Sequence, residues 1–309
     1  MLNFLYCFDK NYNIQASVSI YSLLENLNEK IDLYIIHENS SDLNLPVKIK
    51  NHRNLNTLNL YDFKKNSFTF PKVEGAHVSE ATYYRFFIEN HLPSNIDYIT
   101  YLDADIVTVK NPIEIIENQI IELKNSNYII SVNSELQSQN KSLKLRNSKY
   151  FNAGVMLIDY KKWKNKNMLK NLVEITKNRT EDLVFWDQDV LNIYFDGEYL
   201  ELPKFLNYKL YSSPYQKKQK IVLDSEVTFV HYSGKFKPWS LKGIENSFSI
   251  FYQEIFRSLY SVKYHLADNW KVNTLKDFSK IIFSGRIFRL SYPLTLIVTV
   301  VKFLMNKRK

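Results

Sequence analysis

The sequence is short of cysteine and glycine, and each shortage excludes a kind of structure. Cys7 is the only cysteine among 309 residues, so no disulfide can form within the chain, which fits a reducing compartment. The six glycines form neither a GxGxxG nor a GxxxxGKS/T pattern. A Rossmann dinucleotide site and a P-loop are therefore unsupported, and any nucleotide must be held in another way.

Long apolar runs are also scarce. The N-terminal run, residues 4–8, has no basic segment before it and no small-residue cleavage site after it, which argues against a secretory signal. We read this run as a buried strand. The run at residues 294–305 has 12 residues and one charge, Lys302, whereas a spanning helix needs about 20 apolar residues. The sequence therefore predicts no spanning helix.

Apolar and aromatic residues are nevertheless abundant. The chain is 45% hydrophobic and contains 22 Tyr and 20 Phe, which is typical of a globular protein and excludes global disorder. A chain of this length can bury one large core or two small ones.

The net charge of +9 is concentrated in one segment. Residues 271–309 contain nine Lys or Arg and one acid, Asp277, whereas the rest of the chain contains 32 basic and 31 acidic side chains. A nucleic-acid enzyme spreads its basic residues over the working surface, so this distribution predicts no nucleic-acid partner. It favours an anionic surface as the partner of the C-terminal segment alone.

Short apolar runs alternate with helical patterns in the first two thirds of the chain. Strands are predicted at residues 3–8, 32–37, 57–61, 97–102, 128–132 and 155–158. Helices are predicted along the stripe Ile14, Val18, Tyr21 and Leu24 and at residues 81–89. This alternation predicts the α/β class, an open, mostly parallel sheet with helices on both faces and ligands beyond the carboxyl ends of the strands. The polar stretch at residues 133–149 predicts an exposed loop.

The triplet Asp103-Ala104-Asp105 follows the apolar run at residues 98–102. Two carboxylates at the end of a buried strand can converge on one hard cation, which would bridge the two phosphates of a nucleotide-sugar. A solvated turn after a strand is the alternative interpretation of the triplet.

A second polar segment follows the apolar run at residues 227–230. His231 can complete a site for Mn²⁺, which accepts nitrogen ligands better than Mg²⁺ does. Gly234 lets the backbone approach phosphate closely, and Lys237 supplies a cation for a diphosphate. A core histidine beside a Pro-Trp turn is the alternative.

Two more segments carry carboxylates and amides. Asn152 stands at the start of a buried strand, and Asp187 and Gln188 open a helical pattern. A carboxylate with an adjacent amide can hydrogen-bond several sugar hydroxyls. For Asp187 a helix N-cap is the alternative.

As a set, these segments resemble the family 8 glycosyltransferases. The resemblance covers residues 3–239 and rests on the ordered motifs Phe-Asp-x-Asn-Tyr, His-x-Ser, Thr-Tyr-x-Arg, Leu-Asp-x-Asp, Phe-Asn-Ala-Gly-Val, Asp-Gln-Asp and His-x-x-Gly-x-x-Lys-Pro-Trp. It implies a GT-A type single nucleotide-binding domain at residues 1–245, followed by a helical C-terminal extension at residues 246–309.

The resemblance also implies a role for each matching residue. For the nucleotide, it implies that Asp9, Asn11 and Tyr12 bind uracil and ribose, and that His77, Gly234 and Lys237 lie at the diphosphate. The metal ion is expected to be bound by Asp103, Asp105 and His231, with Ala104 between the two carboxylates. The donor hexose is expected to contact Arg85, Asn152, Asp187 and Gln188. Lys10 departs from relatives that carry an acid there, which weakens the expectation for the base contacts.

The implied activity is transfer of a hexose, galactose or glucose, from a UDP-sugar to a glycan acceptor on lipid or protein, with retention and with Mn²⁺ or Mg²⁺ as cofactor. Gln188, Asp187 and Asn152 are the candidate catalytic residues. Front-face attack and double displacement through Asp187 or Gln188 both stay open. A catalytically silent nucleotide-sugar-binding protein or membrane scaffold is the alternative from another class.

The C-terminal segment combines apolar and basic residues. Leu275, Phe278, Ile282 and Gly285 have helical spacing, and Pro293 should end that helix. With the apolar run that follows and its basic end, the segment predicts an interfacial anchor on anionic lipid, placing the protein in the cytoplasm on the inner face of the plasma membrane. A packed helix with a solvated basic end is the alternative.

Overall fold

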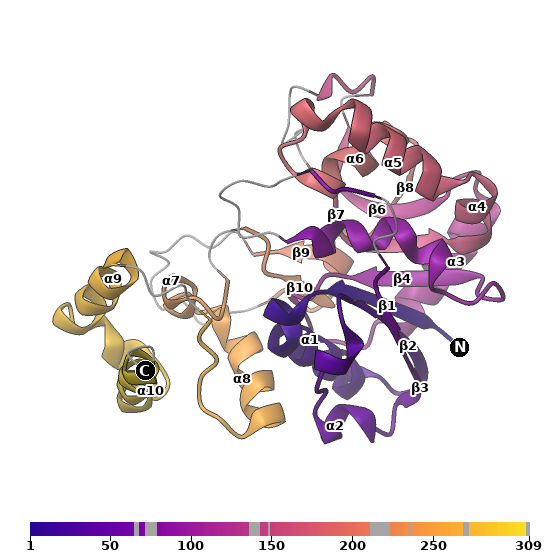
Figure 1. Cartoon of the computed structure of the whole chain (residues 1–309). Coiled ribbons are helices and arrows are strands. Elements are labelled where there is room, and N and C mark those ends of the chain that lie inside the picture. The colour runs from indigo at the N-terminus through magenta and orange to yellow at the C-terminus, as the bar shows by residue number, and fades with distance from the viewer. Residues whose placement is uncertain are drawn as a thin grey trace. The chain divides into compact units, whose positions relative to one another are not determined.

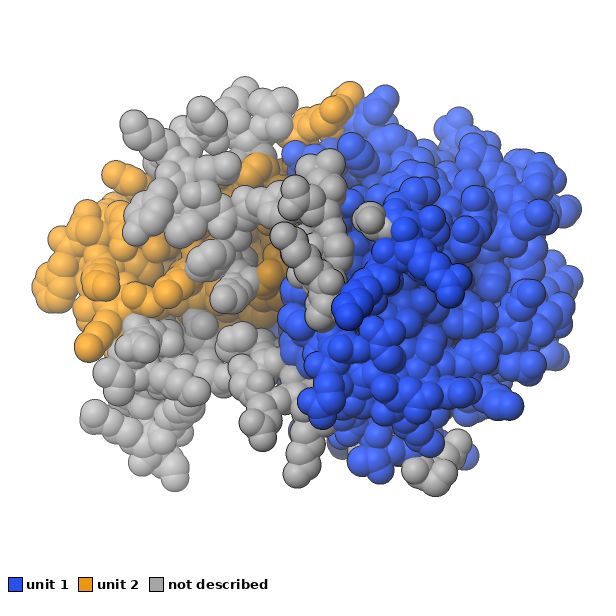
Figure 2. Space-filling model, turned by 90° about the horizontal axis from the view of Figure 1, so that it is seen from above, with its two compact units in different colours: residues 1–208, 226–229 blue, residues 209–225, 230–309 orange. Residues whose placement is uncertain are grey.

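The computed structural model describes residues 1–64, 68–71, 79–135, 143–147, 149–210, 223–234, 237–267 and 272–306, with only the backbone of residues 272–274 and 303–306. The chain divides into two compact units, coloured separately in Figure 2. Unit 1 is Met1–Tyr208 with Glu226–Phe229, and unit 2 is Lys209–Ser225 with Val230–Lys309.

Unit 1 is built on a seven-stranded sheet. The strand order is β3 (Leu55–Asp62), β2 (Ile31–His37), β1 (Asn3–Phe8), β4 (Tyr98–Leu102), β7 (Tyr150–Asp159), β6 (Ile130–Glu135) and β8 (Leu200–Glu201). β1 pairs in parallel with β2 and β4, β2 with β3, and β6 with β8, whereas β7 is antiparallel to both neighbours. The mixed α/β fold with a mostly parallel sheet is confirmed.

Helices accompany the strands along the chain (Figure 1). The helical segments of unit 1 are η1 (Lys10–Tyr12), α1 (Asn13–Asn26), η2 (Ser40–Asp42), α2 (Val47–Lys50), η3 (Glu80–Asn90), α3 (Ile113–Asn125), α4 (Tyr160–Asn165), α5 (Met168–Asn178), η5 (Thr180–Asp182), α6 (Trp186–Phe195) and η6 (Lys204–Asn207).

Both faces of the central strands are buried, as the alternation along β1 shows. Successive side chains of a strand point to opposite faces. Leu5 and Cys7 join a core cluster that includes residues of η3, α4, α5 and α6. Tyr6 points to the other face, where its hydroxyl accepts a hydrogen bond from Ser19 of α1. Helices therefore cover both faces, which is why the strand reads as a continuous apolar run.

The reversed direction of β7 decides what lies at the carboxyl edge of the sheet. Leu102, the last residue of β4, pairs with Val155 inside β7. The Asp103 amide then donates to the Gly154 carbonyl at 2.8 Å. Because β7 is antiparallel, its N-terminal part, which contains Asn152, lies just beyond the end of β4. Two motifs about 50 residues apart in the chain thus meet at one edge.

Several boundaries differ from the sequence predictions. The strand predicted at residues 155–158 begins five residues earlier, because a register shift between Val132 and Asn133 lets β6 and β7 continue to pair. Residues 133–135 of the predicted loop consequently belong to β6. The helix predicted at residues 81–89 is instead a 3-10 helix, with non-helical angles at Phe87.

A second, three-stranded sheet has the order β5 (Ile106–Thr108), β10 (Phe229–His231) and β9 (Tyr208–Lys209). β5 begins directly after the Asp103-Ala104-Asp105 triplet, and β10 ends at His231. The apolar run at residues 227–230 thus contributes its last two residues to β10, which continues to His231.

Unit 2 contains its own helices and core. The helical segments are α7 (Leu241–Ile244), α8 (Ser249–Tyr260), α9 (Val272–Phe283), η7 (Arg286–Arg289) and α10 (Pro293–Asn306). Buried side chains of α7, α9, η7 and α10 form one apolar cluster. Among the helices of the described residues, none has the length and apolar character needed to cross a bilayer.

The predicted C-terminal helix ends sooner than its spacing suggests. We expected it to include Gly285 and to stop at Pro293, but α9 ends at Phe283. Gly285 has φ +68°, a left-handed conformation that terminates a helix and favours glycine. Pro293 begins α10, where its missing amide hydrogen carries no penalty.

Candidate active site

Two carboxylates and an imidazole gather where the sequence predicted a metal site. Asp103, Asp105 and His231 each offer a ligand atom, and these atoms lie within 4.8 Å of one another. Pairing of β5 with β10 explains this proximity, since one strand follows Asp105 and the other ends at His231. Asp105 and His231 are buried. Over the described ranges, no other group of three His, Cys, Asp or Glu side chains has this spacing.

This donor set fits a divalent cation of intermediate hardness. Two carboxylates and one imidazole are together suitable ligands for such a cation. The core-histidine and solvated-turn alternatives do not account for the convergence of three ligand atoms on one point.

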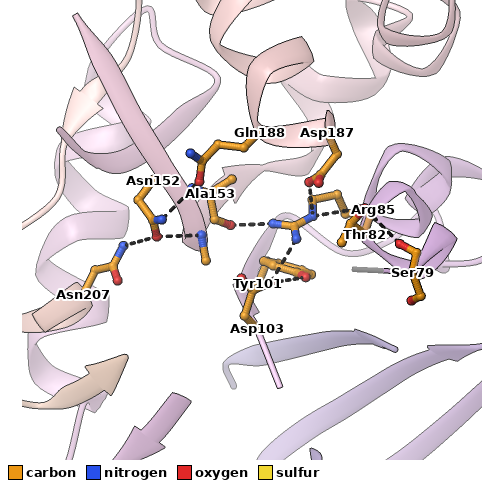
Figure 3. A network of polar contacts seen from close by, with 11 residues as sticks. Ser79, Thr82, Arg85, Tyr101, Asp103, Asn152, Ala153, Asp187, Gln188 and Asn207 are labelled. Atoms are coloured by element: carbon orange, nitrogen blue, oxygen red, sulfur yellow. Dashed lines mark hydrogen bonds and ion pairs between the residues drawn. The ribbon is translucent and has the colours of Figure 1, made fainter. Parts of the chain in front are cut away.

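Arg85, in η3, is a buried cation at the centre of the neighbouring polar network (Figure 3). Its Nη1 donates to the Ala153 carbonyl at 2.6 Å, and its Nε donates to the Thr82 carbonyl at 3.1 Å. Its Nη2 donates to Asp103 Oδ1 at 2.9 Å. The guanidinium carbon lies 4.2 Å from the centre of the Tyr101 ring. These four contacts fix the guanidinium plane.

One oxygen of Asp103 is committed to the protein. Oδ1 accepts hydrogen bonds from Arg85 and from the Tyr101 hydroxyl, the latter at 2.6 Å. The other oxygen is therefore the one available to a cation. Sequence reasoning missed Tyr101 because an aromatic residue in a buried strand carries no chemical signal of its own.

Asp187 is a buried carboxylate beside the same arginine. Its Oδ2 lies 3.0 Å from Arg85 Nε, an ion-pair distance. That N–H is directed at the Thr82 carbonyl instead, so Oδ2 receives charge stabilisation without a directed hydrogen bond. Burial raises the pKa of the Asp187 carboxyl from 3.8 to about 6, although the charge of Arg85 opposes the rise.

The N-cap interpretation of Asp187 is wrong. Asp187 is the second residue of α6, whose N-cap position is Phe185. Asp189 serves the end of the helix instead, because its Oδ2 accepts from the amides of Val184 and Phe185, both at 2.7 Å. Trp186 has φ +46°, a strained conformation for a tryptophan. The side chain of Asp187 pairs with Arg85 of η3 instead.

Gln188 has a fixed amide orientation. Its Oε1 accepts from Asn152 Nδ2 and from the Ala153 amide, each at 3.1 Å. Its Nε2 donates to the Tyr150 hydroxyl at 2.9 Å, and that hydroxyl donates to Asp189. Asn152 Oδ1 is also committed, since it accepts from Gly154 and from Asn207 Nδ2. Tyr150 and Asn207 were not predicted, because only the tertiary structure brings them to the motif.

The remaining predicted residues occupy other places. Asp9 follows β1 and is buried; its Oδ1 accepts from the Asn11 amide at 2.9 Å, and its Oδ2 accepts from Asn11 Nδ2. The bond from the Asn11 amide caps the start of the short helix η1, and Tyr12 is the last residue of that helix. Ala104 is buried between the two carboxylates of the triplet.

In unit 2, Gly234 has φ +88°, which an L side chain rarely adopts. The Lys237 ammonium donates to the Tyr232 carbonyl at 2.8 Å. His77 lies outside the described residues. The described candidates of unit 1 therefore include one connected network, formed by Arg85, Asp103, Asp187, Gln188 and Asn152 and linked through Ala153.

Comparison with known proteins identifies related chains. The model of the family described as Glycosyl transferase family 8 matches residues 3–243. "Glycosyltransferase GlyF" of Streptococcus pneumoniae is 28% identical over 76% of this chain and 56% of its own length. The lipopolysaccharide 1,2-glucosyltransferase of Escherichia coli K12 is 29% identical over 77% of this chain and 72% of its own length. The lipopolysaccharide 1,3-galactosyltransferase of Salmonella typhimurium is 34% identical over 52% and 49%.

Solved structures share the fold. The galactosyltransferase LgtC, solved with donor and acceptor sugar analogues, superposes with a TM-score of 0.69 at 19% identity, over 84% of this chain and 96% of LgtC. GlyE of Streptococcus pneumoniae gives a TM-score of 0.60 over 90% of this chain and 63% of its own. The chain thus spans nearly all of LgtC but little more than half of GlyF.

Proposed function

This chain belongs to glycosyl transferase family 8, and we propose that it transfers galactose or glucose from a UDP-sugar to a glycan acceptor on lipid or protein, with retention of configuration. The observation that carries the proposal is the convergence of Asp103, Asp105 and His231 beyond the carboxyl end of β4. Ligands bind at this edge of open α/β sheets.

Asp103, Asp105 and His231 are the residues that would hold the divalent cation, Mn²⁺ or Mg²⁺. When bound, the ion would neutralise the charge that develops on the departing diphosphate. Arg85 and Tyr101 position one of these ligands through Asp103 Oδ1. The ligand is thereby held before the nucleotide arrives, which lowers the cost of assembling the site.

The donor hexose is proposed to contact Asp187, Asn152, Gln188 and Arg85. Asp187 Oδ2 is a buried oxygen without a directed hydrogen bond, so a sugar hydroxyl can donate to it at little cost. The charge of Arg85 opposes the rise in the pKa of this carboxyl that burial causes. These residues select the hexose by hydrogen bonding, which discriminates more strongly than apolar contact.

Retention through a front-face reaction is the mechanism that these contacts favour. The bond from the anomeric carbon to the diphosphate oxygen breaks, the acceptor oxygen bonds to that carbon on the same face, and the diphosphate oxygen takes the acceptor proton. Gln188 Oε1 already accepts two hydrogen bonds, which makes a weak amide nucleophile weaker. Double displacement through Asp187 or Gln188 is the competing route.

The nucleotide is proposed to lie against residues from both ends of the matched region. Asp9, Asn11 and Tyr12 would receive uracil and ribose, and Gly234 and Lys237, with His77, would receive the diphosphate. Ala104, small and buried, separates the two carboxylate ligands without obstructing the phosphates.

The family match ends at residue 243, which supports a catalytic domain at residues 1–245 and a helical extension at 246–309. We further propose that this extension contacts an anionic membrane surface, with the protein in the cytoplasm on the inner face of the membrane.

A panel of UDP-sugars scored for UDP release, with and without Mn²⁺, tests the reaction. Asp103→Asn and Asp105→Asn should each lower metal-dependent release by about 100-fold or more and weaken Mn²⁺ binding in a paramagnetic-resonance titration. The matched control is Asp97→Asn, which removes an exposed carboxylate that lies just before β4 and pairs with Lys161. Near-normal release by both variants would reject the ligand assignment. Binding of UDP-sugar without any release would favour the silent binding protein.

A further inference from the structure

The C-terminal part of unit 2 exposes large apolar side chains. Phe283 is 90% exposed, Phe288 71% and Leu294 72%, and Tyr292 and Val298 are also exposed. These residues come from the end of α9, from η7, from α10 and, for Tyr292, from the turn just before α10. A soluble domain can tolerate single exposed apolar residues, but a run of them in one segment marks an interaction surface.

Helix α10 is apolar on two faces. Leu296 and Val300, four residues apart, are fully buried in the cluster that also contains Phe278 and Ile281. Leu294, Val298 and Val301 follow the same helical spacing but are exposed. A helix that packs on a domain surface normally carries polar residues on its outer face. The outer face of α10 is therefore suited to a partner less polar than water.

Basic side chains accompany this apolar surface. Lys276, Lys280, Arg289 and Lys302 are exposed on the same elements. Lys263 and Arg257 lie over the Tyr292 ring, with the Lys263 ammonium 4.7 Å from the ring centre. Asp277, the one acid of residues 271–309, is paired with Lys242 of α7 at 3.2 Å. The one acid of this segment is therefore paired with a cation outside it, and the exposed cations of the segment keep their charge.

These charges decide between two partners for the apolar face. A second copy of the chain, placed by two-fold symmetry, would bring the same cations together, and like charges oppose such a contact. An anionic lipid surface offers an apolar phase beneath a layer of negative headgroups, so both features of the segment are satisfied at once. Helix α10 has 14 residues and a length of about 21 Å, shorter than the ~30 Å hydrocarbon core, so it would lie in the plane of the membrane.

We propose that α9, η7 and α10 form an interfacial membrane-binding surface. Phe283, Phe288, Leu294 and Val298 enter the boundary between headgroups and acyl chains of an anionic bilayer, while Lys280 and Arg289 contact the headgroups. This assignment names the contact surface for the membrane partner proposed above, and it is independent of the transfer reaction.

Co-sedimentation of the full chain with vesicles tests the surface. Two vesicle compositions are compared, phosphatidylcholine alone and phosphatidylcholine with 30% phosphatidylglycerol, at about 50 and 500 mM NaCl. We expect binding to the anionic vesicles that falls at high salt. The double variant Phe283→Ser with Phe288→Ser should bind these vesicles at least about 10-fold more weakly than the unmodified chain. The reason is that the apolar area of both rings is no longer buried in lipid.

The matched control is Ile121→Ser, which removes an apolar side chain that is 56% exposed on α3 of unit 1. It should leave vesicle binding unchanged. Lys280→Gln with Arg289→Gln should weaken binding and reduce its salt dependence. Circular dichroism melts show whether each variant is folded, and UDP release should be the same in the phenylalanine variant and the unmodified chain.

Three results would overturn the proposal. The first is equal binding to neutral and anionic vesicles, and the second is unchanged binding by the folded phenylalanine variant. The third is absence of vesicle binding, and a dimer, seen by light scattering, that the same variant dissociates would then identify a second copy as the partner. Failure of UDP release in the unmodified chain would count against the transfer reaction alone.

Discussion

The buried carboxylate of Asp187 should make the stability of this protein depend on pH in a particular direction. Burial raises its pKa from 3.8 to about 6. Between those values the folded chain retains a proton that the unfolded chain has lost. The contribution of Asp187 to the free energy of unfolding therefore falls as the pH rises through this window and is constant above it. At about 1.4 kcal/mol per pH unit, the loss is about 3 kcal/mol.

Replacing Asp187 by Asn removes the ionisation while keeping the size and one oxygen acceptor. The variant should gain about 3 kcal/mol of unfolding free energy relative to the unmodified chain when the pH is raised from 4 to 7.5. Urea denaturation followed by circular dichroism, at several pH values in metal-free buffer, measures this difference. Comparing the two chains at each pH cancels the titration of the other groups.

Glu117→Gln, on the exposed side of α3, is the control for loss of a carboxylate. A stability difference between the Asp187 variant and the unmodified chain that stays constant from pH 4 to 7.5 would refute the reasoning. It would mean that Arg85, 3.0 Å away, fully compensates the burial of the charge. The same variant should also lose most hexose transfer, because the proposed acceptor of a sugar hydroxyl becomes a neutral amide.

Two further predictions follow from single contacts. Tyr101→Phe keeps the ring under Arg85 but removes the hydroxyl bonded to Asp103, so Mn²⁺ should bind about 10- to 100-fold more weakly in a paramagnetic-resonance titration. The control variant Tyr98→Phe, on the same strand, should bind Mn²⁺ as the unmodified chain does. Equal Mn²⁺ affinities of the Tyr101 variant and the unmodified chain would show that Arg85 alone positions the ligand. Trp163→Ala empties a fully buried site on α4 and should cost about 3–5 kcal/mol in urea denaturation, and a loss below about 1 kcal/mol would indicate that the core collapses to fill the space.

The sequence alone was enough to identify the fold class and the family. Alternation of apolar runs with helical stripes depends on local periodicity, which the structure retains as β1, β2, β4 and α1. The spaced motifs are equally local, and the match to residues 3–243 confirms the resemblance that they indicated. Boundaries were less certain where pairing decided them, as at β7, or where backbone conformation did, as at Gly285.

The chemistry of individual oxygen atoms depended on the tertiary structure. Whether Asp187 caps a helix or pairs with Arg85, and which oxygen of Asp103 is bonded to Arg85 and Tyr101, depends on these long-range contacts. These contacts join residues up to about 100 positions apart, and their geometry is set by strand register and by the reversed direction of β7. The two apolar faces of α10 are likewise alike in sequence. Only packing distinguishes them, because burial depends on what the rest of the chain places beside each face.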